Sequence, residues 1–163
     1  MIEQTLLPTR HEELEVATVP AMVDAIYRLA VRGAPAIGVA GAFGVLLGVQ
    51  HETGRTPDDL MEHLLGVCAT LDDARPTAVN LSWATRRMRR RAEREHAAGG
   101  DAEGIVSALF EEAETIWSED RETCKKLGEH GAGLIADGAT VLTHCNAGTL
   151  ATVQGGTALA PIY

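Results

Sequence analysis

The thiol of Cys145 is the most chemically distinctive group in the sequence, because it follows an apolar run and precedes a turn of small residues. Residues 139–144 read Ala-Thr-Val-Leu-Thr-His, and Asn146-Ala-Gly148 follows the cysteine. This pattern predicts a buried strand over 139–144 and then a loop that opens a helix. Ligands and catalytic groups gather at such strand ends in open α/β sheets. The alternative is that Cys145 is a small buried hydrophobe, as most isolated cysteines are.

Two arginines each stand just before the start of an expected helix. Arg32 is followed by Gly33-Ala34-Pro35, and Arg75 is followed by Pro76. The free N–H groups of a helix start, together with a guanidinium, form a plausible phosphate contact. Two such turns could hold one phosphate between them if folding brings them together. The alternative for each arginine is a capping role in solvent.

The elements that must position these groups are mostly helices. Apolar residues at helical spacing, prolines in first turns and capping residues predict five helices before the strand. A stripe of glycines along the second helix indicates that other elements pack closely against it: Gly38, Gly41, Gly44 and Gly48. The expected helices cover 19–31, 35–50, 57–71, 78–98 and 102–126 or on to 135, and a further helix starts near 149. The clearest domain boundary lies near residue 137, where helices give way to the strand.

Composition and charge limit the classes of function. The chain has 163 residues, 45% of them hydrophobic, and a net charge of −9, which argues against a nucleic-acid partner. Its three cysteines are widely spaced and show no metal-ligand pattern, so we expect free thiols in the cytoplasm, with Cys68 and Cys124 as packing residues. No apolar stretch reaches the roughly 20 residues that span a bilayer, so no membrane partner is expected.

A run of arginines between residues 86 and 94 is the one feature that suggests nucleic acid. Glu93 interrupts the run and no aromatic residues interleave it. We therefore favour a solvated helix face, or ion pairs to the acidic stretch 111–122.

Three segments together resemble the methylthioribose-1-phosphate isomerase family. They are Val31-Arg-Gly-Ala-Pro-Ala-Ile-Gly38, Arg75-Pro-Thr-Ala-Val-Asn-Leu81 and Leu142-Thr-His-Cys-Asn-Ala-Gly148, and their order and spacing match as well. Pro35 in the first segment favours this family over the ribose-1,5-bisphosphate isomerases. It also favours it over the regulatory subunits of the translation-initiation exchange factor, which share the fold.

The resemblance implies a mainly helical N-terminal domain over residues 1–136. Over 137–163 it implies the first strand, loop and helix of a truncated Rossmann-like α/β domain, in a protein that assembles as a homodimer. The family reaction is an aldose–ketose isomerisation of a small sugar phosphate in methionine salvage, from 5-methylthioribose 1-phosphate to 5-methylthioribulose 1-phosphate. It uses no metal or organic cofactor. Carried over, Cys145 is catalytic, and the substrate-binding residues are Arg32, Gly33, Ala34 and Arg75.

The chain departs from that family in length. Members of the family are much longer, and their catalytic aspartate is expected beyond Tyr163, so we expect this stretch alone to be inactive. A strand without neighbours also exposes unpaired edges, which predicts that residues 139–163 are disordered, misplaced or paired with another chain. Two other readings remain open: a non-catalytic regulatory or interaction subunit of the same superfamily, and a related sugar-1-phosphate isomerase with a different C5 substituent.

Overall fold

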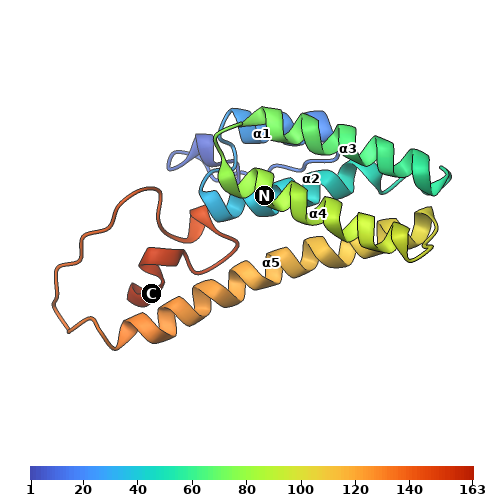
Figure 1. Cartoon of the computed structure of the whole chain (residues 1–163). Helices are drawn as coiled ribbons and strands as arrows, with labels where there is room; N and C mark the ends of the chain where they lie inside the picture. Colours follow the sequence, from blue (N-terminus) through green and yellow to red (C-terminus); the bar gives the residue numbers. More distant parts are fainter.

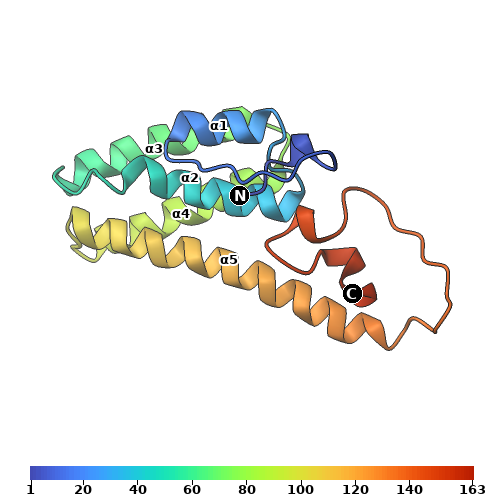
Figure 2. The same ribbon diagram turned by 180° about the vertical axis from the view of Figure 1, so that it is seen from behind.

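Five α-helices form a bundle in the structure, a computed structural model that describes residues 1–163. They are α1 (Val19–Tyr27), α2 (Ala34–Val49), α3 (Pro57–Ala74), α4 (Val79–Ala97) and α5 (Ala102–Ala132). Short 3₁₀-helices lie near both ends of the chain: η1 (Gln4–Leu6), η2 (Thr149–Ala151) and η3 (Thr157–Ile162). α5 runs along one side of the bundle and projects beyond it toward the C-terminal segment (Figures 1 and 2).

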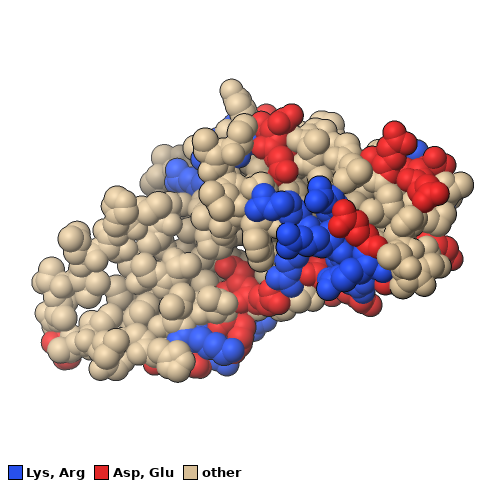
Figure 3. Space-filling view, viewed as in Figure 1, with Lys and Arg blue, Asp and Glu red and all other residues tan.

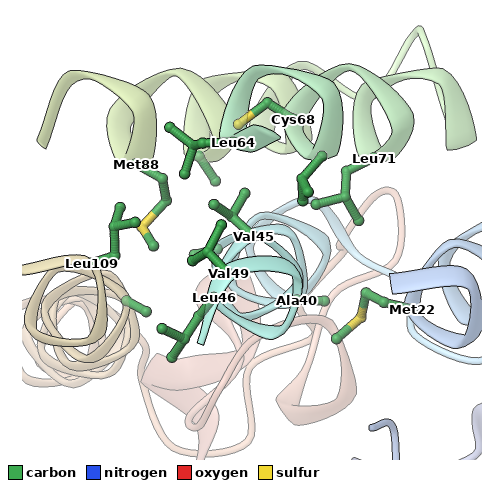
Figure 4. Packing of buried hydrophobic residues seen from close by; sticks show 14 of the residues in the cluster. Met22, Ala40, Val45, Leu46, Val49, Leu64, Cys68, Leu71, Met88 and Leu109 are labelled. Atoms are coloured by element: carbon green, nitrogen blue, oxygen red, sulfur yellow. The ribbon is translucent and has the colours of Figure 1, made fainter. Parts of the chain in front are cut away.

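The central element of the bundle is α2, which is apolar on all sides and contacts each of the other four helices. Figure 4 shows Val45 and Val49 of α2 among side chains of the neighbouring helices, with Leu64 of α3, Met88 of α4 and Leu109 of α5 around them. Burial of such aliphatic side chains contributes about 1.5–3 kcal/mol each. The predicted helical N-terminal region is confirmed.

The glycine stripe of α2 is where its neighbours come closest. A Cβ added at Gly41 would lie 2.6 Å from a methyl carbon of Leu81, and one at Gly48 would lie 2.6 Å from a methyl carbon of Val67. At Gly38 the nearest atom would be the backbone oxygen of Asn80, at 3.1 Å. The close packing expected from the sequence is confirmed, and it joins α2 to both α3 and α4.

Side-chain caps fix the starts of three helices. The Thr18 hydroxyl accepts from Ala21 N at the start of α1, and Thr56 does the same for α3. The carboxylate of Asp101 accepts from Gly104 N at 2.8 Å and so caps α5. Each cap of this kind contributes about 1 kcal/mol.

Two helix ends differ from the sequence prediction. α1 ends at Tyr27 instead of continuing to Val31, because Leu29 adopts a left-handed backbone conformation with φ 64° and turns the chain. The N–H of Val31 then donates to the carbonyl of Ala25 at 3.3 Å. α3 continues beyond Leu71 to Ala74, whereas the end of α5 at Ala132 lies within the expected range of 126 to 135.

The strand predicted over 139–144 does not form. These residues are irregular and exposed, and Leu142 is 96% exposed. A strand needs neighbouring backbone groups for its hydrogen bonds. No segment of the chain lies beside 139–144 to supply them, and the one isolated β-bridge joins Ile2 to Glu13. The expectation of a Rossmann-like strand here is therefore corrected for this stretch of chain.

The last residues pack against the projecting part of α5 instead of forming the expected helix from Thr149. η2 and η3 replace that helix, and η3 lies on glycines of α5. A Cβ at Gly131 would meet the Pro161 ring at 2.4 Å, which shows how closely the two segments approach. No helix of the protein combines the length and the apolar character that crossing a membrane requires.

Candidate functional site

The Arg32-Gly33-Ala34 turn stands at the start of α2. Gly33 is the N-cap residue with φ 101°, a backbone conformation that favours glycine, and Ala34 is the first helical residue. No side chain caps this helix start, and Pro35 has no N–H, so the N–H groups of Ala34 and Ala36 have no side-chain partner. Arg32 is exposed and Gly33 is partly buried. The structure thus places these three predicted residues at an uncapped helix N-terminus.

Arg75 occupies the turn between α3 and α4. It is the C-cap residue of α3 and is partly buried, and its carbonyl accepts from Ala78 N at 2.9 Å. Neither Arg75 nor Arg32 takes part in an ion pair within the chain. Because Gly38 of α2 faces Asn80 of α4, the two helix starts lie side by side. The arginine-bearing turns that precede them therefore belong to the same end of the bundle.

Cys145 lies in the exposed segment that precedes η2. Its backbone has φ 69° and its carbonyl accepts from Ala147 N at 3.1 Å, which forms a tight turn. Cys145 is the one exposed cysteine, since Cys68 and Cys124 are buried as predicted. No hydrogen bond joins its thiol to Arg32 or Arg75, and Cys145 does not line either of the cavities described below.

The residues just after Cys145 reach the start of α2. A Cβ on Gly33 would lie 2.4 Å from the Cα of Ala151, so η2 sits directly on this turn. The side-chain amide of Gln4 donates to the carbonyl of Leu150 at 2.8 Å and holds η2 from the other side. The first sequence motif therefore contacts η2, which begins directly after the third motif ends at Gly148.

Asp120 is a candidate that sequence reasoning missed. It lies on α5 and accepts a hydrogen bond from Val153 N at 2.7 Å. Burial raises its pKa above the usual range of an aspartate, although the bond from Val153 opposes this. The signal was present: Ile116, Asp120 and Cys124 are four residues apart, which places the aspartate on the buried face of α5.

Two cavities adjoin these turns. One of about 490 Å³ has a mostly apolar lining supplied by the N-terminal segment, α1, α2, Trp117 of α5 and residues 149–153. A smaller one, of about 270 Å³, lies where α2, α4 and α5 meet. It is lined by Pro35, Val39, Asn80, Trp83, Ile116, Glu119, Asp120 and Thr123. No three His, Cys, Asp or Glu side chains are grouped as a metal site requires.

The arginine run on α4 forms the basic patch visible near the middle of one face in Figure 3. Arg87 pairs with Glu112 at 2.5 Å and also with Glu119, and Arg91 pairs with Glu95 at 3.0 Å. The expected ion pairs to the acidic stretch of α5 are confirmed for Arg87. Arg90 forms no ion pair and is exposed.

Similar proteins include both enzymes and a translation factor. Methylthioribose-1-phosphate isomerase from Chloroflexus aurantiacus is 50% identical over 162 residues, which cover 99% of this chain and 46% of that protein. 5-Deoxyribose 1-phosphate isomerase from Moorella thermoacetica is 48% identical over 163 residues, 100% of this chain and 46% of that protein. The chain thus spans about half the length of the curated relatives it matches.

Solved structures give the same picture. 5-Methylthioribose 1-phosphate isomerase from Pyrococcus horikoshii superposes with a TM-score of 0.89 and 36% identity, over 98% of this chain and 44% of that one. Translation initiation factor eIF-2B subunit delta from A. fulgidus gives 0.85 and 42% identity, over 99% and 46%. The model of the initiation factor 2 subunit family matches residues 30–161. The chain belongs to the initiation factor 2 subunit family.

Proposed function

We propose that this chain supplies the substrate-binding turns and the catalytic cysteine of a cytoplasmic, homodimeric aldose–ketose isomerase. The reaction is the conversion of 5-methylthioribose 1-phosphate to 5-methylthioribulose 1-phosphate in methionine salvage. The observation that carries the proposal is the contact of Gly33 with Ala151 of η2, because η2 begins four residues after Cys145. Residues 137–163 then begin a Rossmann-like domain, in which 139–144 gains strand neighbours.

The phosphate is assigned to the starts of α2 and α4. The uncapped N–H groups of α2 and the guanidinium of Arg32 supply anion contacts on one side, and Arg75 supplies a charge-assisted bond on the other. The chain carries a net charge of −9, so an anionic substrate depends on such local positive groups.

The chemistry must open a sugar ring whose anomeric carbon carries a phosphate, and then move hydrogen between C2 and C1. Ring opening needs a general acid within hydrogen-bond reach of the ring oxygen, and hydrogen transfer needs a second proton-transfer group. We assign the thiol of Cys145 to one of these roles. The other falls to an aspartate in the part of the relatives that this chain does not match.

The apolar cavity of about 490 Å³ suits an apolar substituent at C5 of the sugar. Its lining includes Ala36 close to the start of α2 and Leu150 of η2, so it adjoins the proposed phosphate site. A methylthio group and the methyl group of a 5-deoxy sugar both fit this lining better than a hydroxyl or a phosphate does. The relatives named for these two substrates are therefore both informative guides.

A chimaera tests the proposal. The matched stretch of the Chloroflexus aurantiacus relative is replaced by residues 1–163 of this chain, and turnover of 5-methylthioribose 1-phosphate and 5-deoxyribose 1-phosphate is measured. We expect the chimaera to be active, the 163-residue chain alone to be inactive, and Cys145→Ser to lower kcat by orders of magnitude. Arg32→Ala and Arg75→Ala should raise KM, whereas Arg90→Ala, an exposed arginine on α4, serves as the matched control. A Cys145→Ser chimaera with normal kcat removes the thiol from the mechanism.

A non-catalytic interaction subunit is the second candidate, favoured by the 42% identity to the eIF-2B subunit delta structure. Unlike the isomerase, an interaction subunit would not turn over a sugar phosphate. An inactive chimaera that is folded and does not bind the sugar phosphate would favour this candidate.

A further inference from the structure

Asp120 connects three parts of the proposed site that are distant in the sequence. It lies on α5 and lines the cavity of about 270 Å³ together with Pro35 from the first turn of α2 and Asn80 from the first turn of α4. Its carboxylate also holds the backbone N–H of Val153, just beyond η2. No other carboxylate in the chain bonds to a backbone N–H of the segment that follows Cys145.

The contact with Val153 is one of a set that fixes this segment. Gln4 holds Leu150 and Gly33 meets Ala151, so anchors follow one another along residues 150–153. One turn further along α5, Cys124 packs against Gly155, where an added Cβ would lie 3.2 Å from that of the cysteine. Upstream of these anchors Gly148 is buried and its N–H donates to the carbonyl of Gly156 at 3.3 Å, whereas residues 141–146, which include Cys145, are exposed. The placement of the thiol therefore depends on how firmly residues 150–155 are held.

The position of Asp120 is unfavourable for a charged carboxylate. It is partly buried and no lysine or arginine pairs with it, and burial disfavours its charged form. The other titratable group that lines the same cavity is Glu119, whose charge is already matched by Arg87. Ile116 and Cys124, one turn away on either side, are buried, so an apolar residue at position 120 would fit the face of the helix equally well. An anchoring role accounts for a polar residue there.

We infer that Asp120 is a positioning residue, which accepts the Val153 N–H and thereby holds the Cys145-bearing segment against the starts of α2 and α4. The inference rests on the proposed function for its effect on catalysis. The anchor itself does not depend on that function, because it joins groups that are both within this chain.

The anchor can be tested in the 163-residue chain without any activity. The amide proton resonance of Val153 should shift as pH rises through the raised pKa of Asp120, since the bond becomes charge-assisted when the carboxylate ionises. Asp120→Asn should abolish this titration. Glu122→Gln, an exposed neighbour on α5, should leave it unchanged. A Val153 resonance that is insensitive to pH would overturn the anchor.

The positioning role is tested by kinetics in the chimaera. Asp120→Ala removes the acceptor and should lower kcat roughly 10- to 100-fold with little change in KM, because misplacement of a reacting group costs rate. Asp120→Asn keeps an acceptor oxygen and should restore most of that loss, and Glu122→Gln should behave as the parent. Equal losses in the Ala and Asn variants, or no loss in either, would overturn the role. An inactive parent chimaera would instead contradict the proposed function and leave the Val153 result standing.

Discussion

At the scale of single residues, Gly33 is a position where both the backbone conformation and the packing exclude a side chain. Its φ of 101° strains any other residue, and a Cβ there would overlap Ala151. We predict that Gly33→Ala lowers the free energy of unfolding by about 1–3 kcal/mol, measured by urea denaturation. Gly66→Ala is the matched control, because no atom lies within 4 Å of its added Cβ inside α3. That variant should be more stable by about 0.5–1 kcal/mol. A Gly33→Ala protein as stable as the parent would show that η2 does not dock as described.

Glu3 provides a second prediction, on pH. Its buried carboxylate forms an ion pair with Arg28 at 2.5 Å and accepts a hydrogen bond from the Thr5 hydroxyl at 2.6 Å. These contacts lower the pKa of Glu3 from 4.5 to about 2. Since the folded pKa lies below the unfolded one, the ionised group stabilises the fold above pH 4.5, and this contribution is lost as pH falls toward about 2. Glu3→Gln should flatten this part of the stability–pH curve, measured by urea unfolding at several pH values. Glu15→Gln, at an exposed position, should leave the curve unchanged.

At the scale of elements, what the sequence predicted depended on how local the causes were. Thr56 and Asp101 cap α3 and α5 through N–H groups three residues away, so these starts could be read directly. The stretch 139–144 has the residue types of a strand, but a strand forms only when another strand pairs with it. The local pattern of residue types therefore located the segment 139–144 but could not determine its conformation.

The ion pairs that Arg87 of α4 forms with α5 give a prediction at this scale. Arg87 bridges Glu112 and Glu119 across the two helices and lies over the Trp83 ring at 5.5 Å. We expect Arg87→Ala to cost about 1–2 kcal/mol of unfolding free energy, because partly buried charged hydrogen bonds are lost. The cost should shrink at high salt, which screens the exposed part of the pair.

Arg90→Ala is the control for the Arg87→Ala measurement. Arg90 is exposed on the same helix and has no ion-pair partner, so its loss should change the unfolding free energy by less than about 0.5 kcal/mol. Equal effects of the two substitutions would mean that the bridge to α5 contributes nothing specific.

At the scale of the whole molecule, candidate site residues could be named from the sequence, but their arrangement could not be predicted. Arg32 and Arg75 could be named because each precedes a helix start. Their common location depends on the packing of Gly38 against Asn80, which is a tertiary contact. The spacing of Asp120 could place it on the buried face of α5, but its bond to Val153, 33 positions further along the chain, could not be predicted.

The exposed segment 133–147 leads to the last prediction. Leu134 and Leu142 are 86% and 96% exposed, and this stretch has few hydrogen bonds that would protect it. Limited digestion with subtilisin should therefore cut first within 133–147 and leave the five-helix bundle intact, as seen by mass spectrometry. Trypsin is the control, because no Lys or Arg follows Lys126 and it has no site in this segment. In the chimaera the same bonds should become resistant, since strand neighbours would cover 139–144. First cuts within α1–α5, or equal susceptibility in both proteins, would contradict this account of the segment.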